Sequence, residues 1–192
     1  MPASQRRVTP DDIIPDAAFA AERKQRRAAL LPAKALRRVA LGPWCSFIFE
    51  SFDSMLFQIQ EMLLIEKGGA EQLKDELDAY NPLIPQGSEL VATVMFEIDD
   101  PVRRDRVLRE LGRVEDHFFI RVGAERAAGV AEGDIERTRD DGKTSSVHFL
   151  RFALTPAQKA AFGGPGVEVM IGCDHERYAY LAVRVSGHST AR

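Results

Sequence analysis

The sequence predicts a single α+β domain in which an antiparallel or mixed sheet is packed with helices. Helical and strand patterns alternate irregularly along the chain, which argues against a regular succession of parallel βαβ units. Short turn signals separate pairs of strand patterns and predict hairpins. The 192 residues are 45% hydrophobic, enough for one sizeable core. We expect a basic helical arm over residues 1–38 that packs on the body, an α+β domain over residues 39–185, and a frayed tail over residues 186–192.

The N-terminal half is predicted to be mainly helical. Residues 16–31 are rich in Ala, Arg, Lys, Glu and Leu, which favours a helix that Pro32 interrupts before a short helical piece over residues 33–38. Residues 44–51 are predicted to form a buried strand. The helix that follows, ending at Gly68, is apolar almost all round and is therefore predicted to be buried. A third helix is predicted over residues 70–80.

The C-terminal half is predicted to contain most of the strands. Residues 89–98 alternate in polarity as a half-buried strand does. Short helices are predicted after Asp100-Pro101 and Thr155-Pro156, because a capping side chain followed by proline suits a first helical turn. The other predicted strands span residues 118–122, 145–154, 167–173 and 178–185, the last two forming a hairpin.

Charge is distributed unevenly along the chain. Residues 1–38 hold nine Lys/Arg against four acids (+5), residues 39–100 two against twelve (−10), and residues 101–192 fifteen against thirteen (+2), which gives the net charge of −3. We expect the arm to pack on its own acidic body. Nucleic-acid binding through the arm is the less favoured interpretation, because no nucleic-acid motif accompanies the basic residues.

A candidate polar cluster is predicted around the buried helix, because polar groups there must find partners. Its members are Gln58, Gln60, Glu61, Glu66, Glu76, Tyr80 and Asn81. An Arg–Glu network between the arm and the helix is the favoured interpretation, and a carboxylate-lined pocket is the functional alternative.

A metal site is predicted less strongly. Cys173, Asp174 and His175 lie in one hairpin, but adjacent residues of a tight turn cannot all reach one ion, and zinc or iron needs three or four ligands. His148, in a predicted strand, is a further weak candidate. Nucleotide-binding and common hydrolase motifs are missing from the sequence, so no catalytic residue or cofactor is predicted.

The sequence also bears on location. We expect no transmembrane helix, since no run of about 18 apolar residues occurs. We also expect no secretory signal. Two cysteines, Cys45 and Cys173, are too few for a disulfide scaffold, so a cytoplasmic protein with reduced thiols is predicted.

Several segments together resemble a bacterial family of about 190 residues that is known only as a domain of unknown function. The resemblance covers nearly the whole chain, and its most specific part is residues 58–63, Gln-Ile-Gln-Glu-Met-Leu. Other matching segments are residues 41–43, 49–50, 76–77, 80–81, 83–85, 89–93, 147–152 and 175–178, together with Glu66. Family members tend to have proline after the histidine of the last hairpin, whereas this chain has Glu176. Genes of this family often lie beside those of a rubrerythrin and an iron–sulfur oxidoreductase subunit.

The resemblance implies an accessory or interaction module in a redox or oxidative-stress context, with rubrerythrin-type or iron–sulfur proteins as partners. One alternative is a metal-dependent or carboxylate-based enzyme that uses Glu61 and Glu66 with His148 or His175. The other is a nucleic-acid binder that uses the basic arm.

Overall fold

The computed structural model describes residues 5–132, 138–139 and 141–185, which fall into two compact units. The helical unit comprises Met1–Arg38 and Ile48–Gly87. The sheet unit comprises Val39–Phe47 and Ser88–Arg192. The tail predicted over residues 186–192 lies outside the described residues.

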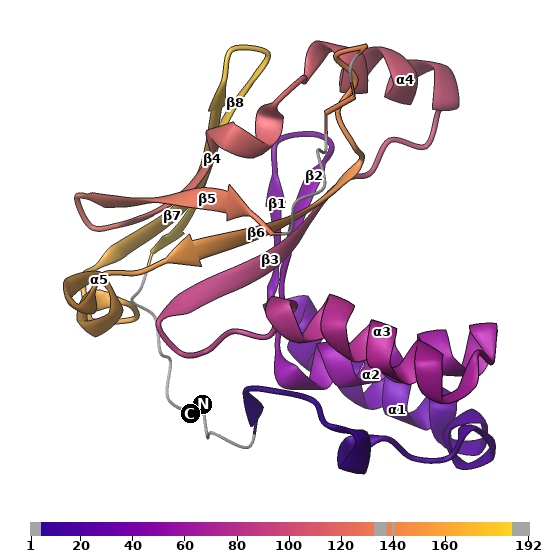
Figure 1. The fold of residues 1–192 in the computed structure, drawn as a ribbon. Coiled ribbons are helices and arrows are strands. Elements are labelled where there is room, and N and C mark those ends of the chain that lie inside the picture. Colours follow the sequence, from indigo (N-terminus) through magenta and orange to yellow (C-terminus); the bar gives the residue numbers. More distant parts are fainter. Residues whose placement is uncertain (1–4, 133–137, 140, 186–192) are drawn as a thin grey trace. The chain divides into compact units, whose positions relative to one another are not determined.

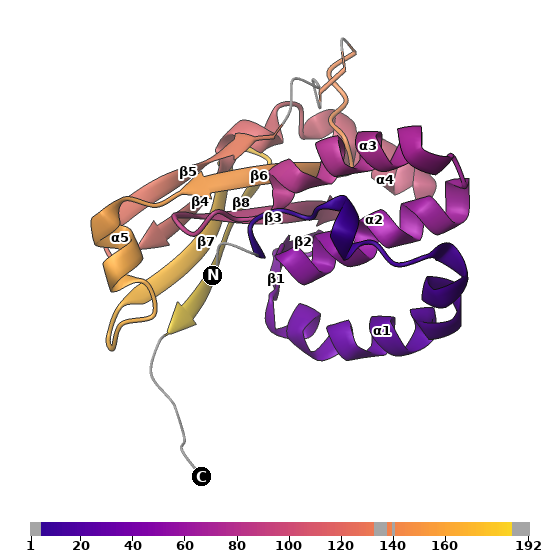
Figure 2. The same ribbon diagram turned by 60° about the horizontal axis from the view of Figure 1, so that its bottom comes forward.

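The helical unit is built on α2 (Phe52–Glu66), which lies between α1 (Asp16–Leu36) and α3 (Gly69–Tyr80) in both views (Figures 1 and 2). The central position agrees with the predicted all-round apolar surface, and Ile59 at the middle of α2 is fully buried. Ser51 begins the helix by accepting a hydrogen bond from the backbone N–H of Ser54. Lys67 ends it in the left-handed conformation, at φ 56°.

Helix α1 differs from the prediction, because it continues through Pro32 to Leu36. A proline removes one backbone hydrogen bond, to the carbonyl of Ala28, but both residues are exposed and water can satisfy that carbonyl. Phe19 is the buried side chain of α1, and its ring packs on Phe57 of α2 at 5.6 Å. Short 3₁₀ turns, η2 (Pro10–Asp12) and η3 (Asn81–Leu83), lie before α1 and after α3.

The eight strands form one sheet in the order β1-β2-β3-β6-β5-β4-β7-β8. Pairing is antiparallel, as in the register of Thr93 with Phe149 between β3 and β6. The strands are β1 (Arg38–Leu41), β2 (Cys45–Phe49), β3 (Glu89–Phe96), β4 (Phe118–Val122), β5 (Glu125–Ala131), β6 (Val147–Ala153), β7 (Glu168–His175) and β8 (Tyr178–Val185).

The sheet curls until strands far apart in this order meet (Figure 1). The ring of Phe47 on β2 packs edge-on against Phe118 on β4 at 5.3 Å, although three strands separate β2 from β4. Phe96 on β3 likewise packs against Tyr178 on β8 at 5.5 Å. The Tyr178 hydroxyl donates to the carbonyl of Leu41 at 2.6 Å and so joins the last strand to the first. The result is a nearly closed antiparallel barrel.

The predicted fold class is therefore wrong. We expected an antiparallel or mixed sheet packed with helices, whereas the sheet is antiparallel and closes on itself. The physical reason is that aromatic rings from its own strands fill the concave face, which then needs no covering helix. The chain does contain both helices and strands, as predicted.

Three short helical segments connect the strands of the sheet unit. Helix α4 (Pro101–Glu110) and α5 (Pro156–Ala161) begin at the predicted caps, where Asp100 accepts from Arg103 N and Thr155 from Gln158 N. The 3₁₀ turn η4 (Val114–His117) leads into β4. None of the described helices is both long and apolar enough to cross a membrane.

Candidate functional site

The candidate site is a cavity of about 340 Å³ in the helical unit, between one face of α1 and one face of α2. The two helices run antiparallel, since Phe49 N, just before α2, donates to Arg37 O at the end of α1 at 3.0 Å. Near the other end, Arg23 of α1 binds Glu61 of α2. The cavity thus extends along the groove between two fixed contacts.

Positive side chains of α1 line one wall of this cavity. Arg27, Lys34 and Arg37 recur at spacings of seven and three residues, which places them on one face of the helix. Within the described residues, no acidic side chain forms an ion pair with any of the three. The Nε of Arg37 is buried and has no hydrogen-bond partner among the described residues. A buried donor without a partner is unfavourable, so this wall favours a negatively charged occupant.

The acidic groups of the cavity are held by other polar groups. Arg23 donates from Nε and Nη2 to the two carboxylate oxygens of Glu61 at 2.7 and 2.6 Å. These hydrogen bonds raise the pKa of Arg23 above its ordinary value. The carboxylate of Glu50 accepts a hydrogen bond from Ser54 Oγ at 2.6 Å. With Arg23 included, four cations face two carboxylates, which leaves an excess of two positive charges.

The rest of the cavity wall is apolar. Leu30 of α1 and Met55, Phe57, Met62 and Ile65 of α2 line it. Ile65 is 62% exposed, so an occupant could cover apolar surface that now faces water. A second cavity of about 230 Å³ shares Leu30 and Phe57 with the first. The combination of apolar walls and a few charged groups is typical of small-molecule sites.

Of the predicted polar cluster, Gln58 and Glu61 line the candidate cavity. Gln58 Nε2 donates to the hydroxyl of Tyr80 at 3.5 Å, the outer limit for a hydrogen bond. Gln60 lies on another face of α2, where its amide exchanges two 3.1 Å hydrogen bonds with the backbone of Ile14. The predicted residues therefore do not converge on one point.

The other members of the predicted cluster have separate partners. Glu66 and Glu76 both accept from Gln72 Nε2 at 3.2 Å, so an amide bridges the two carboxylates. Asn81 exchanges two hydrogen bonds with the backbone of Val8, at 2.7 and 3.0 Å. These contacts tie α3 to α2 and to the N-terminal segment.

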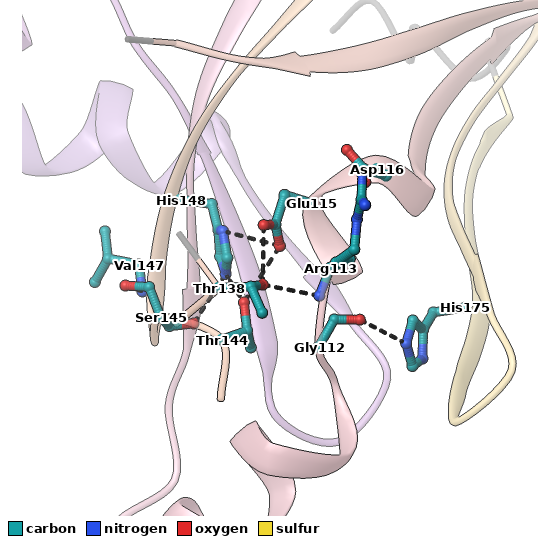
Figure 3. A network of polar contacts seen from close by, with 10 residues as sticks. All are labelled: Gly112, Arg113, Glu115, Asp116, Thr138, Thr144, Ser145, Val147, His148 and His175. Carbon is teal, nitrogen blue, oxygen red and sulfur yellow. Dashed lines mark hydrogen bonds and ion pairs between the residues drawn. The ribbon is translucent and has the colours of Figure 1, made fainter. Parts of the chain in front are cut away.

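His148, one of the candidate metal ligands, belongs to a buried polar network in the sheet unit (Figure 3). Its Nε2 lies 2.8 Å from Ser145 O, and its Nδ1 lies 3.8 Å from the carboxylate of Glu115. Glu115 also accepts hydrogen bonds from the hydroxyls of Thr138 and Thr144, at 3.1 and 3.2 Å. His148 has 0% exposure, so its ring is closed to solvent and the network holds η4 against the start of β6.

The remaining metal candidates lie at the hairpin of β7 and β8. Asp174 binds Arg126 at 2.7 Å and His117 at 3.0 Å, and these contacts, Arg126 first, hold its carboxyl pKa below the usual range. His175 accepts from Arg177 N and lies 3.3 Å from Gly112 O, so both ring nitrogens are occupied. Cys173 is buried. In the part of the chain that the structure describes, no three His, Cys, Asp or Glu side chains could hold a metal ion.

From the sequence, Arg27, Lys34 and Arg37 are expected as members of the basic arm and not of a site. Their spacing was the available signal, because residues three and seven apart share a helix face. Glu115 and Thr144 were missed altogether. These two residues form a hydrogen bond although they lie 29 residues apart in the sequence, and no local pattern reveals such a contact.

Comparison with known proteins confirms the predicted family resemblance. The family model described as "Protein of unknown function (DUF3501)" matches residues 7–191. The chain belongs to this family. A crystal structure of a protein of unknown function from Burkholderia pseudomallei K96243 is 38% identical, with 93% of each chain covered and a TM-score of 0.85. No curated protein matches the chain.

Proposed function

We propose that this member of the family is a binding module that takes a small anionic molecule into the α1–α2 cavity. The observation that carries the proposal is the wall of three cations, Arg27, Lys34 and Arg37, for which the described residues supply no acidic partner. Because Arg23 already neutralises Glu61, that carboxylate does not satisfy them. An anion would receive charge-assisted hydrogen bonds from these guanidinium and ammonium groups, of which Arg37 is partly buried.

Binding without catalysis is the better-supported form of the proposal. The cavity lining contains no histidine or cysteine. Its one hydroxyl, on Ser54, is engaged in capping α2, where it accepts from Ser51 N at 2.9 Å and donates to Glu50. The lack of a three-ligand metal group among the described residues gives the metal-enzyme alternative no support.

Nucleic-acid binding by the arm is less well supported than binding of a small anion. Arg23 pairs with Glu61, and Arg26 with Glu22 at 2.7 Å, so part of the arm's charge is already neutralised. Arg27, Lys34 and Arg37, which have no acidic partner among the described residues, border the apolar lining of the cavity, and no nucleic-acid motif accompanies them.

The proposed module acts as an accessory protein, and the family resemblance suggests rubrerythrin-type or iron–sulfur proteins as its partners. Co-purification with tagged partners of those two kinds would test this. We also propose a cytoplasmic location, because Cys45 and Cys173 are both free thiols, as expected in a reducing compartment. Cell fractionation would test the location.

The test of the binding proposal is a titration of the full chain with sodium acetate, at constant ionic strength set with sodium chloride. Acetate is expected to raise the melting temperature of the wild type, and Lys34→Gln to remove most of that rise. Lys24→Gln is the matched control, since this lysine lies on the same helix but does not line the cavity. The proposal would be contradicted if both variants lost the acetate-induced rise in melting temperature equally, or if the wild type showed no such rise.

A further inference from the structure

Resting on the proposed function, we infer that the ligand is an anionic amphiphile, with a carboxylate head and an unbranched apolar chain. The inference comes from the way the cavity combines cations with apolar side chains along its length. Lys34 and Arg37 lie in the last turn of α1 and just after it, where Phe49 N binds Arg37 O. Met62 and Ile65 lie in the last two turns of α2, toward the opposite end of the groove, where Arg27 and the Arg23-bound Glu61 also lie.

The length of the cavity suits a chain of several carbons. Ser54 and Met62 both line the cavity and lie eight residues apart on α2, which corresponds to about 12 Å along the helix axis. A small inorganic anion would fill only the end near Lys34. An unbranched chain would extend from there past Leu30 toward Met62.

The apolar residues suit a flexible chain. Met55 and Met62 have unbranched, polarisable side chains that adapt to the shape of an apolar partner. Leu30 is half-buried and Ile65 is 62% exposed, so covering them removes apolar surface from water. The cations alone would select any anion, and this surface adds a preference for one with a tail.

The charges favour a head with one negative charge. Arg37 and Lys34 can bind a carboxylate, and the Gln58 amide on the facing helix can donate a further hydrogen bond. The carboxylate of Glu50 lines the same cavity and would repel a doubly charged phosphate more strongly than a singly charged carboxylate.

The test compares three probes by calorimetry on the full chain: acetate for the head, 1-octanol for the tail and octanoate for both, each below its aggregation limit. Octanoate is expected to bind at least about tenfold more tightly than either of the others. Ile65→Gln should weaken the binding of octanoate by roughly fivefold and leave the affinity for acetate unchanged. Leu31→Gln is the matched control, because Leu31 is 55% exposed on α1 and does not line the cavity.

The outcomes separate this inference from the proposed function. If acetate and octanoate bind equally well and Lys34→Gln weakens both, the cavity binds anions but the inferred tail is wrong. If octanol binds as tightly as octanoate, or if no probe binds, both the amphiphile and the anion-binding function are wrong. An equal effect of Ile65→Gln and Leu31→Gln on octanoate would also overturn the inference.

Discussion

Arg23 and Glu61 form a two-pronged ion pair, with nitrogen–oxygen distances of 2.7 and 2.6 Å, between α1 and α2. Glu61 lines the candidate cavity and Arg23 does not. Arg23 therefore influences the charge of the cavity without lining it. It binds the Glu61 carboxylate, which would otherwise attract Arg27. As a surface ion pair it contributes little to stability.

Replacing Arg23 should weaken anion binding although this residue does not line the cavity. In Arg23→Gln the Glu61 carboxylate is released toward Arg27 and competes with the ligand, so octanoate affinity should fall several-fold. Glu61→Gln should raise the affinity or leave it unchanged. Arg26→Gln is the matched control, because Arg26 pairs with Glu22 on its own helix. An Arg23→Gln variant with wild-type affinity would show that the ion pair does not control the cavity.

The core of the helical unit can be tested at Ile59, which is fully buried in α2. Ile59→Ala should lower the free energy of unfolding by about 2–5 kcal/mol, because it removes apolar contacts and leaves a cavity. Ile65→Ala, at a 62% exposed position of the same helix, should change it by no more than about 0.5 kcal/mol. Urea denaturation of the two variants measures the difference, and equal midpoints would mean that α2 is not the core element.

The sequence predicts α2 and several strands well because their signals are local. The nearly all-round apolar surface of residues 52–66 reflects a helix covered on two sides, by α1 and α3. Strand β4 spans the predicted residues 118–122, where an apolar run has the length of a strand. Strand β8 has the predicted bounds, and β7 begins one residue and ends two residues after the predicted ones.

Closure of the sheet could not be predicted in the same way. Alternation of polarity identifies a face but does not distinguish a sheet that curls from a flatter sheet covered by helices. Closure depends on pairs such as Phe47 with Phe118, from strands that are not neighbours. In the predicted polar cluster, Gln60 and Asn81 bind backbone atoms 46 and 73 residues away, and a backbone partner leaves no signature in the sequence.

The two cysteines should be unreactive in the folded protein. Burial raises the pKa of Cys45, and raises that of Cys173 to about 11, so almost no thiolate exists at pH 8. Ellman's reagent should therefore label both thiols quickly in urea and very slowly without it, and single serine variants would assign each signal. Fast labelling of either thiol in the native protein would contradict this. Slow labelling would show that neither thiol is a reactive group of the folded protein.

Tyr178 joins the last strand of the barrel to the first, because its hydroxyl donates to Leu41 O at 2.6 Å and accepts from Cys45 N at 3.0 Å. Tyr178→Phe leaves these buried backbone groups without partners, so unfolding should become easier by about 1–3 kcal/mol. Tyr180→Phe is the matched control, since Tyr180 is 40% exposed on the same strand.

The loss of stability in Tyr178→Phe should also depend on pH in a defined direction. Burial raises the pKa of Tyr178 to about 12, above the value of about 10 expected in the unfolded chain. A raised acid pKa means that the folded state favours the neutral phenol. Its contribution is therefore complete below pH of about 10 and is lost as the pH rises toward 12. The stability difference between wild type and Tyr178→Phe, measured by urea denaturation, should thus be constant from pH 7 to 9 and shrink above pH of about 10. A difference that grows with pH would mean that the hydroxyl is not held as a neutral donor to Leu41.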